Sequence, residues 1–518
     1  MRKFYILSVA LALLIGITNA NPVHNKKTGK KATTGSSTSL GGVMASRTLT
    51  AGTYTLDSSA YFDVMDTLKI LPGVKILATG NYNIEIAGTL ICNGTNDNPI
   101  FLTADDEKTA HDSLGHEGWW GGLLLDSSCL YASVTFTHIN YTGGPDGSGG
   151  FQASFDVEGS QSYNGGAQII FEDNWMFGGM DDAIHLAGNI TASVKRNVLQ
   201  RLGGPDGDLM NIKAGAEGDI AYNYIWSSAN SGVKLNTGKK VFSPQTKFNI
   251  YNNTFVNGNW RKVGELSSAI LIDQFSAANI YNNIIVGCRN GINITDISDY
   301  NHTKYSNNLI YTYNSAPYAS VDSFTNNPYI PGSKGSVQSS DVIGSGLTAC
   351  ASVFTQWSPD IEVDTADTNI PTLLPNSPAI GKGTTTATLW TSFSGGAAVG
   401  SSMPLNTDLG AYPKDNTGNK HLPTLYPNGP AGISSTFVGN HNFTVYPNPV
   451  MDQLYISLAS AKGNIQVDII NLQGKVVLAQ TVAAANQTSI NVSNLNKGIY
   501  ICRVIQGSSV ETIKIIKE

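Results

Sequence analysis

The chain is poor in charged residues, which make up only 14% of it. Its 32 basic residues stand against 38 acidic ones, for a formal net charge of −6. A protein whose main partner is nucleic acid needs a dense basic surface to neutralise phosphates, so this composition argues against that class. Long amphipathic helical patterns are also scarce, whereas glycine is abundant at 54 residues. The composition is typical of β structure with many tight turns.

Cysteines are few and lie far apart. Their odd number and the absence of any C-x-x-C pair argue against a disulfide framework and against zinc ligation by cysteine. Three of them adjoin apolar runs, so we expect these three to be small core residues. The five are Cys92, Cys129, Cys288, Cys350 and Cys502, the first three being those beside apolar runs.

Only one long apolar run occurs, and it lies at the N-terminus. Arg2 and Lys3 precede an apolar stretch that ends near Ile17 and is followed by a small residue, Ala20. This pattern predicts a cleavable signal peptide over residues 1–20, with a single membrane anchor as the alternative. Residues 21–47 are polar and low in complexity, and we expect a flexible leader there. No membrane span is expected once the signal is removed.

A loose repeat runs through the middle of the chain. Its clearest mark is an Asn beside a short β-type run, and a second run such as DAIHL or GVKLN alternates with the first. Two strands per period without a helical pattern predict the coils of a parallel β-helix. We expect the Asn side chains to stack as an amide ladder, because Asn tolerates left-handed backbone at sharp turns. These residues are Asn174, Asn197, Asn223, Asn253, Asn283 and Asn308.

Short motifs outside this repeat carry a family resemblance. Gly88-Thr89-Leu90, Pro99-Ile100 and Trp120-Gly121-Gly122 are followed much later by SPAIGKG (377–383) and DLGAY (408–412). In these motifs the chain resembles secreted bacterial members of the pectate-lyase-like, right-handed parallel β-helix superfamily. The resemblance implies a β-helix over residues 48–412. The fold hosts lyases, hydrolases, adhesins and inert stalks, so it does not by itself assign an activity.

The last block, residues 442–518, has alternating strands separated by turn signals such as Asn496-Lys497-Gly498, which predict a small antiparallel β-sandwich. It resembles the C-terminal sorting domain of the type IX secretion pathway of Bacteroidetes in VYPNP (445–449), Gly498-Ile499-Tyr500 and the terminal KIIK (514–517). The resemblance implies binding to the type IX machinery, passage through the periplasm and delivery outside the cell or to its surface. An accessory binding sandwich is the alternative. Residues 413–441 are interpreted as a linker.

Period-2 alternation predicts which side chains of the second run share a face. One outward row holds Asp156, His185, Asn211, Lys234, Leu271 and Asn293, and the next outward row holds Glu158, Lys213, Asn236 and Asp273. A third row, at the turn that enters each strand, holds Asp182, Asp208, Ser231, Ser268 and Asn290. The paired aliphatic positions, such as Ile184 and Leu186, are expected to face the core.

These rows predict a carbohydrate-directed site. The main hypothesis is calcium-assisted β-elimination of a uronate-containing polysaccharide, with Asp181, Asp182, Asp206 and Asp208 as calcium ligands. Lys234 or Lys213 would be the base, and His185 would assist. Residues 204–225 resemble a strand pair of pectate lyases, an acidic turn that leads into I-K-x-G. The alternatives are a non-catalytic adhesin or glycan-binding stalk, a glycoside hydrolase that uses Asp181 and Asp182, and turn residues without any function.

Overall fold

The computed structural model describes most of the chain. The described residues are 38–107, 110, 118–159, 166–204, 207–238, 245–262, 267–313, 327–359, 361, 370–394, 396–423, 443–446, 450–458, 464–471, 475–483, 487–506 and 509–517. The chain divides into two compact units, Met1–Pro427 and Asn428–Glu518. The expected signal peptide and much of the expected linker lie outside the described residues.

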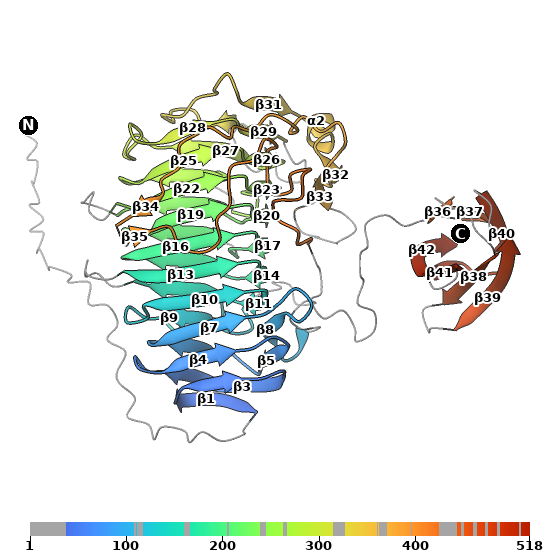
Figure 1. Ribbon diagram of the computed structural model, residues 1–518, viewed down its shortest axis with the longest axis horizontal. Helices are drawn as coiled ribbons and strands as arrows, with labels where there is room; N and C mark the ends of the chain where they lie inside the picture. Colours follow the sequence, from blue (N-terminus) through green and yellow to red (C-terminus); the bar gives the residue numbers. More distant parts are fainter. Residues whose placement is uncertain are drawn as a thin grey trace, which may run out of the picture. The chain divides into compact units, whose positions relative to one another are not determined.

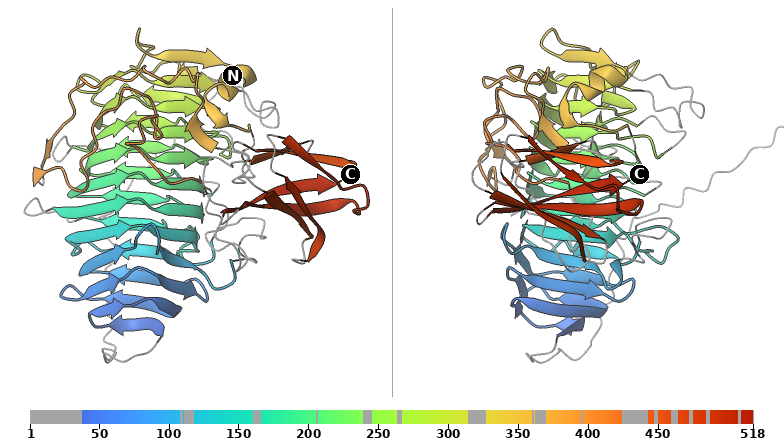
Figure 2. Two further views of the ribbon diagram at one scale, coloured as in Figure 1. Left: turned by 45° about the vertical axis from the view of Figure 1, so that its right-hand side comes forward. Right: turned by 90° about the vertical axis from the view of Figure 1, so that its right-hand side faces the viewer.

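The first unit is a parallel β-helix whose coils stack from the N-terminal end upward (Figures 1 and 2). Each complete coil contributes one strand to each of three sheets, and neighbouring strands within a sheet are parallel. Sheet 1 contains β2 (Arg47–Leu49), β4 (Thr67–Ile70), β7 (Thr89–Asn93), β10 (Tyr131–Thr135), β13 (Ala167–Glu172), β16 (Ile190–Lys195), β19 (Glu217–Ala221), β22 (Lys247–Tyr251), β25 (Ala277–Tyr281) and β28 (Lys304–Ser306).

Sheets 2 and 3 are the two halves of one continuous 21-stranded sheet. Sheet 2 contains β5 (Val74–Ala78), β8 (Ile100–Ala104), β11 (Thr137–Thr142), β14 (Trp175–Gly179), β17 (Val198–Leu202), β20 (Tyr224–Trp226), β23 (Thr254–Val256), β26 (Ile284–Val286), β29 (Leu309–Thr312) and β31 (Val342–Ser345). Sheet 3 contains β6 (Asn83–Ile86), β9 (Gly122–Leu125), β12 (Phe155–Glu158), β15 (Ile184–Ala187), β18 (Met210–Lys213), β21 (Val233–Asn236), β24 (Ile270–Asp273), β27 (Asn290–Ile294) and β30 (Asn327–Tyr329). The halves join through β1 (Ser39–Met44) and the long β3 (Gly52–Phe62), which pairs with both β5 and β6.

The core runs the length of the coils as columns of stacked aliphatic side chains. Ile184 and Leu186 are fully buried and lie in register with Met210 and Ile212 of the next coil. The predicted inward positions are therefore confirmed. Because each strand lies ~4.8 Å from its neighbour, equivalent side chains touch from coil to coil and exclude water continuously.

The predicted Asn ladder is present at the turn between sheets 1 and 2. From Asn197 onward, the side-chain oxygen of each Asn accepts hydrogen bonds from both the backbone N–H and the amide of the Asn one coil earlier, as Asn223 does from Asn197 at 3.0 and 2.9 Å. The expected left-handed backbone lies one residue earlier in the chain, for example at Arg196 and Tyr222. The ladder Asn itself is not left-handed, so the expectation is wrong in that detail.

Both ends of the helical unit lie outside the expected 48–412 range. Strand β1 and the first residue of β2 fall within the segment expected to be a flexible leader. Beyond the last coil the chain forms α2 (Leu347–Ala351), β32 (Phe354–Gln356) and β33 (Ile370–Leu373) and then a long strap, residues 381–423, that includes β34 (Ser392–Phe393) and β35 (Gly396–Ala397). The strap runs back along the coils (Figure 1) and contacts them as far as Asp173. Residues 413–423 therefore belong to the β-helix unit.

The second unit is a small antiparallel β structure, as predicted. One sheet is formed by β36 (Phe443–Tyr446), β37 (Gln453–Leu458) and β40 (Gln487–Asn491), and the other by β39 (Val476–Ala483), β38 (Asn464–Asn471), β41 (Gly498–Gln506) and β42 (Ser509–Lys517). A core that includes Leu454, Ile469 and Cys502 lies within this unit. Across the described part of the whole chain, no helix has the length and apolar character needed to cross a membrane.

Candidate functional site

The strap covers the outer face of sheet 1 from the end of β13 to β25, whereas outward side chains of earlier strands, such as Lys69 and Tyr131, are exposed. Side chains that point outward from β16 and β22 would be exposed on a bare helix, yet Lys195 is 2% exposed and Asn249 is 0% exposed. Tyr251 packs with Met403 and Leu405 of the strap in an apolar cluster. This face is therefore a buried interface within the unit.

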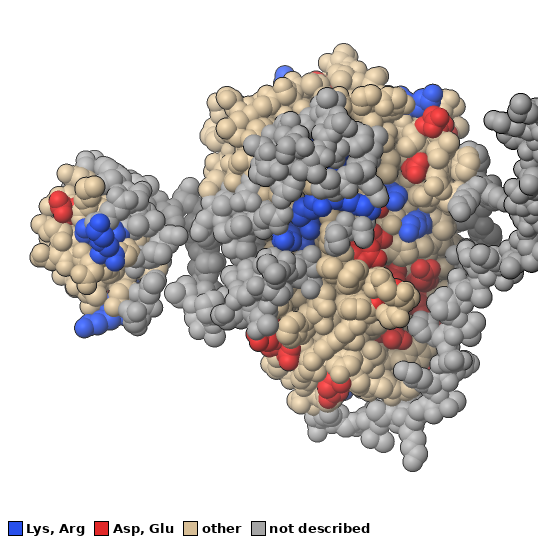
Figure 3. Space-filling view, turned by 180° about the vertical axis from the view of Figure 1, so that it is seen from behind, with Lys and Arg blue, Asp and Glu red and all other residues tan. Residues whose placement is uncertain are grey.

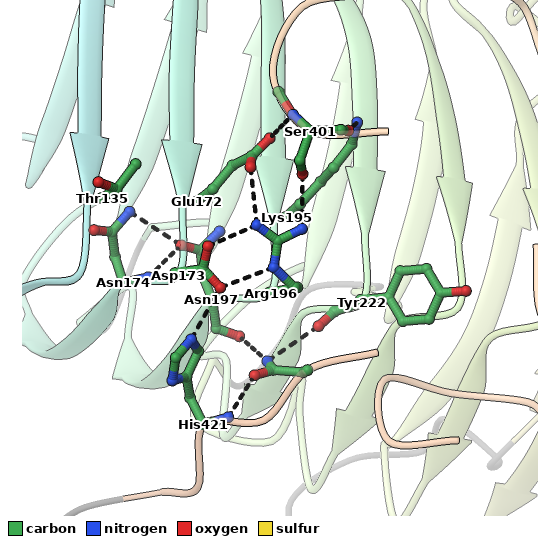
Figure 4. Close-up of polar contacts among 12 residues, drawn as sticks. Thr135, Glu172, Asp173, Asn174, Lys195, Arg196, Asn197, Tyr222, Ser401 and His421 are labelled. Carbon is green, nitrogen blue, oxygen red and sulfur yellow. Dashed lines mark hydrogen bonds and ion pairs between the residues drawn. The ribbon is translucent and has the colours of Figure 1, made fainter. Parts of the chain in front are cut away.

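A cluster of charged groups fastens the strap to sheet 1 (Figure 4). Arg196 donates hydrogen bonds to Glu172 at 2.9 Å and to Asp173 at 2.6 Å. His421 lies 2.9 Å from the other oxygen of Asp173, and the N–H of Ser401 donates to Glu172 at 2.9 Å. Each charge here has a partner of opposite sign or a hydrogen bond, which is the condition for burying charge without a large penalty. The cluster is structural.

The outer face of sheet 2 is also covered from β17 to β29, and here the contact is apolar. Tyr224 and Trp226 point outward from β20 and are fully buried against an outer cluster that contains Phe354, Leu409 and Tyr412. Sheet 2 thus has apolar side chains on both faces, which is the pattern of a strand layer buried on both sides.

Sheet 3 has the open face. Along its outward row, Asp156, His185, Lys234 and Asn293 keep part of their surface accessible. Figure 3 shows the side of the molecule opposite to Figure 1, where carboxylates and basic side chains gather together. Among the described residues, the C-terminal extension covers the later coils of the other two faces, and the contacts that it makes there do not extend to these outward side chains of sheet 3.

The predicted outward rows of sheet 3 are confirmed by its register. Asp156 pairs with His185, His185 with Asn211, and Asn211 with Lys234. The next row pairs Lys213 with Asn236. Parallel in-register pairing places these groups on one side of the sheet at intervals of ~4.8 Å. Side chains that belong to successive coils in the sequence are therefore neighbours on this face.

At one end of this row, two carboxylates and a histidine come together. His185 Nδ1 lies 2.7 Å from Asp156 Oδ1 and 3.9 Å from Glu158 Oε1. One potential ligand atom from each of the three lies within 4.8 Å of the others. Burial lowers the pKa of His185, but its hydrogen bond to Asp156 and the charge of Asp156 outweigh this effect and raise the pKa. The histidine is therefore held close to an acidic pair.

The turn row is a second ladder, made of carboxylates. Asp182 accepts hydrogen bonds from the N–H of Asp208 and from the Asn211 amide, both at 2.8 Å. Asp208 in turn accepts from the N–H of Ser231 at 2.9 Å and from Lys234 Nζ at 3.1 Å. Both oxygens of each carboxylate therefore have partners within the protein. These two residues hold the turns together, whatever else they bind.

The carboxylate ladder brings several negative charges close together. Burial, followed by the charges of Asp181 and Asp208, raises the pKa of Asp182 to about 6. The pKa of Asp181 is also raised, chiefly by burial, against the opposing effect of a hydrogen bond from the Asp182 N–H and of the charges of His185 and Lys213. A carboxylate whose ionisation is resisted in this way is stabilised by any cation that approaches it.

The two candidate bases differ in their surroundings. Lys234 is held by the buried Asp208, and although burial lowers its pKa, the attraction of Asp208 raises it overall. Lys234 is therefore protonated at neutral pH. Lys213 lies half-buried on the next outward row, near Glu158, Asp181 and His185. Within the described part of the chain it forms no ion pair or hydrogen bond.

Of the residues predicted from sequence, Asp181, Asp182, Asp208, Lys234, Lys213 and His185 are brought together on or beside the open face. Asp206 lies outside the described residues. The predicted ligand set omitted Asp156 and Glu158, although both were placed in the outward rows. Their alternation in the segment FDVE, two acids on one side of a strand, was the signal that could have added them.

The second unit matches a known family. Residues 444–518 match the family model of the secretion system C-terminal sorting domain. None of the curated proteins shows a significant match to the chain. The match agrees with the antiparallel strands described for this unit, and it indicates secretion, with delivery to the cell surface or outside the cell. The protein is therefore a parallel β-helix protein that carries the sorting domain of the type IX secretion pathway.

Proposed function

We propose that the protein acts on a uronate-containing polysaccharide that binds along the open face of sheet 3. The observation that supports this proposal most directly is that the C-terminal extension covers the other two faces over the later coils, alongside the polar row of sheet 3. The outward row from Asp156 to Asn293, polar except at Leu271, spans six strands, or roughly 24 Å, which suits an extended polymer. An extended polymer can bind along such a face without a deep, enclosed pocket.

The reaction that best fits the face is β-elimination. A base removes the proton next to the sugar carboxylate, the bond to the leaving oxygen breaks, and an unsaturated end forms while solvent returns a proton to the released oxygen. Lys213 is the better candidate for the base because it forms no ion pair with any described residue, whereas Lys234 Nζ is held 3.1 Å from the Asp208 carboxylate. Lys234 then contributes positive charge toward the acidic polymer.

A non-catalytic glycan-binding surface is the second candidate. It is favoured by the carboxylate ladder, because both oxygens of Asp182 and Asp208 already serve the turns between coils. Calcium bound by Asp181, Asp182, Asp206 and Asp208 remains a prediction, and it would have to share these oxygens with their present partners.

The test uses the full chain with pectate, alginate and related acidic polymers. Turnover appears as absorbance from unsaturated ends, and Lys213→Ala should reduce it about 100-fold. Lys247→Ala is the matched control, because Lys247 pairs with Glu217 on the covered face. Binding without turnover would favour the second candidate. The absence of both binding and turnover on every acidic polymer tested would overturn the proposal.

A further inference from the structure

The open face is acidic, although the proposed substrate is acidic as well. Asp156, Glu158, Asp181, Asp182 and Asp208 lie in or beside it, against only two lysines in its outward rows. Like charges on protein and polymer repel each other, so a uronate could approach only if cations neutralise part of this charge. The geometry of the group formed by Asp156, Glu158 and His185 shows where such a cation would bind.

These three residues form a set of side chains that converge from one side. Asp156 and Glu158 alternate on β12 and therefore point the same way, and His185 is paired with Asp156 on the adjacent strand β15. The three candidate ligand atoms lie within 4.8 Å of one another. Ligands ~2 Å from a common tetrahedral metal ion lie about 3.3 Å apart, so the side chains must close in by about 1 Å when the ion binds. The solvent side of the group stays open, as it does in catalytic metal centres with three protein ligands.

The donor atoms favour one class of metal. Calcium and magnesium prefer all-oxygen sets, whereas an imidazole with two carboxylates is typical of zinc, manganese and neighbouring first-row metals. His185 is also held in place before any metal binds, because its ring is fixed by Asp156 at 2.7 Å. A pre-positioned histidine reduces the entropy lost on coordination.

A neighbouring amide provides independent support. Asn211 is in register with His185 on the next coil, is only 7% exposed, and its Oδ1 has no hydrogen-bond partner. Buried polar atoms without a partner are rare, and each one points to a missing ligand or water. An amide oxygen beside the histidine can accept a hydrogen bond from metal-bound water or enter the coordination shell. Lys213 is the one nearby group whose charge opposes a cation, and Asp181 and Asp182 outnumber it.

We propose that Asp156, Glu158 and His185 bind one divalent cation of the zinc–manganese class, with the Asn211 oxygen directed to it or to its water. The cation site is supported by its own geometry. Its role, which is to bind the carboxylate of an acidic sugar at the open position, rests on the proposed function.

Metal binding can be measured without any polysaccharide. The metal-free full chain is titrated with Co²⁺, Zn²⁺, Mn²⁺ and Ca²⁺ by calorimetry, and Co²⁺ is also followed by its visible absorption. We expect one site per chain, tighter for Zn²⁺ and Co²⁺ than for Ca²⁺. Replacing one ligand, as in His185→Gln, should weaken Zn²⁺ binding about 100-fold or more.

The chain offers a matched control. His302 also has an aspartate partner, Asp299, at 2.8 Å, but His302 is exposed and no third ligand from the described residues accompanies the pair. His302→Gln should therefore leave Zn²⁺ affinity unchanged. Glu158→Gln alters a half-exposed side chain, so it tests the site even if His185→Gln impairs folding.

The outcomes separate the two proposals. Equal Zn²⁺ affinity in the wild type, His185→Gln and Glu158→Gln would overturn the cation site, and so would an equal loss in His302→Gln. A site that binds Zn²⁺ in a protein that neither binds nor cleaves acidic polymers would support the cation site and overturn its link to the proposed function. Preference for Ca²⁺ over Zn²⁺ would contradict the metal class.

Discussion

Asp182 lies where the coils are most crowded with carboxylates. It is 7% exposed, it bonds to the following coil through two acceptor oxygens, and its pKa is raised to about 6 by burial first and then by Asp181 and Asp208. A buried acid with this pKa makes the stability of the turn depend on pH. The folded protein binds a proton there more tightly than the unfolded chain does.

The sign of this dependence follows from the pKa values. Between the ordinary value of 3.8 and about 6, the folded state holds the Asp182 proton and the unfolded state releases it, so stability falls as pH rises through this window. The full loss amounts to about 3 kcal/mol at most. We expect Asp182→Asn to remove this contribution while keeping a hydrogen-bond acceptor for the Asp208 N–H.

The measurement is the urea midpoint of wild type and Asp182→Asn at pH 4 and pH 7. The wild type should lose more stability than the variant between these values. Asp146→Asn serves as a control, because hydrogen bonds from Ser148 lower the pKa of the exposed Asp146, so its effect has the opposite sign. Identical changes in wild type and Asp182→Asn would show that Asp182 does not titrate in this window.

At the residue scale, the sequence predicted which side chains share a face but not what each one bonds to. The row of Asp156, His185, Asn211 and Lys234 follows from alternation alone, because a strand has only two sides. The bonds from Asp182 to the next coil depend on how the turns stack, and Asp, Asn and Ser are common in turns of any kind. The structural use of the turn acids therefore could not be separated from metal ligation.

At the scale of elements, the Asn ladder defines the turn from sheet 1 to sheet 2. Asn223 donates its amide to Val194 at 2.8 Å and to Asn253 at 3.0 Å, and it accepts two bonds from Asn197. Asn223→Ala would leave several buried donors and acceptors without partners, so we expect a loss of about 3 kcal/mol in the free energy of unfolding.

Denaturation of purified Asn223→Ala by urea gives this value directly. Asn293→Ala is the comparison, because Asn293 is half-exposed in the outward row of sheet 3 and its loss should cost little. Equal destabilisation of the two variants would mean that the ladder contributes no more than an ordinary surface amide.

The strap could not be predicted as an element of the β-helix. It has almost no regular structure of its own, and its hydrogen bonds join it to residues far back in the chain. The amide of Asn419 in the strap donates to the carbonyl of Asn197, and the hydroxyl of Tyr251 in the coils donates to the carbonyl of Met403 in the strap. Local patterns of Pro, Gly and Asn indicate loop or linker equally well. Only the closing motifs around residues 377–412 hinted that the chain returns to the coils.

At the scale of the whole molecule, secretion and the proposed polysaccharide binding are assigned to two separate units of the chain. The coils form one compact unit and the sorting domain forms another, each with its own core. Deleting residues 442–518 should therefore leave the β-helix folded but retain the protein in the periplasm.

Cell fractionation with immunoblotting locates the truncated protein, and resistance to trypsin reports whether its coils are folded. The full chain expressed in the same cells is the comparison. Normal surface delivery of the truncated protein would contradict the role of the tail, whereas a degraded product would show instead that the coils need the second unit.

The strap also changes how the β-helix can come apart. A solenoid held together only by contacts between neighbouring coils can lose its end coils one at a time. Here the strap reaches Asn307 through Lys382, Asn282 through Asn406 and Asp173 through His421, so it spans coils that never touch one another. The coils that it spans are thereby joined into one cooperative block, and fraying from the last coil must first peel the strap away. Because the strap is made after all of these coils, this block closes only when nearly the whole unit has left the ribosome.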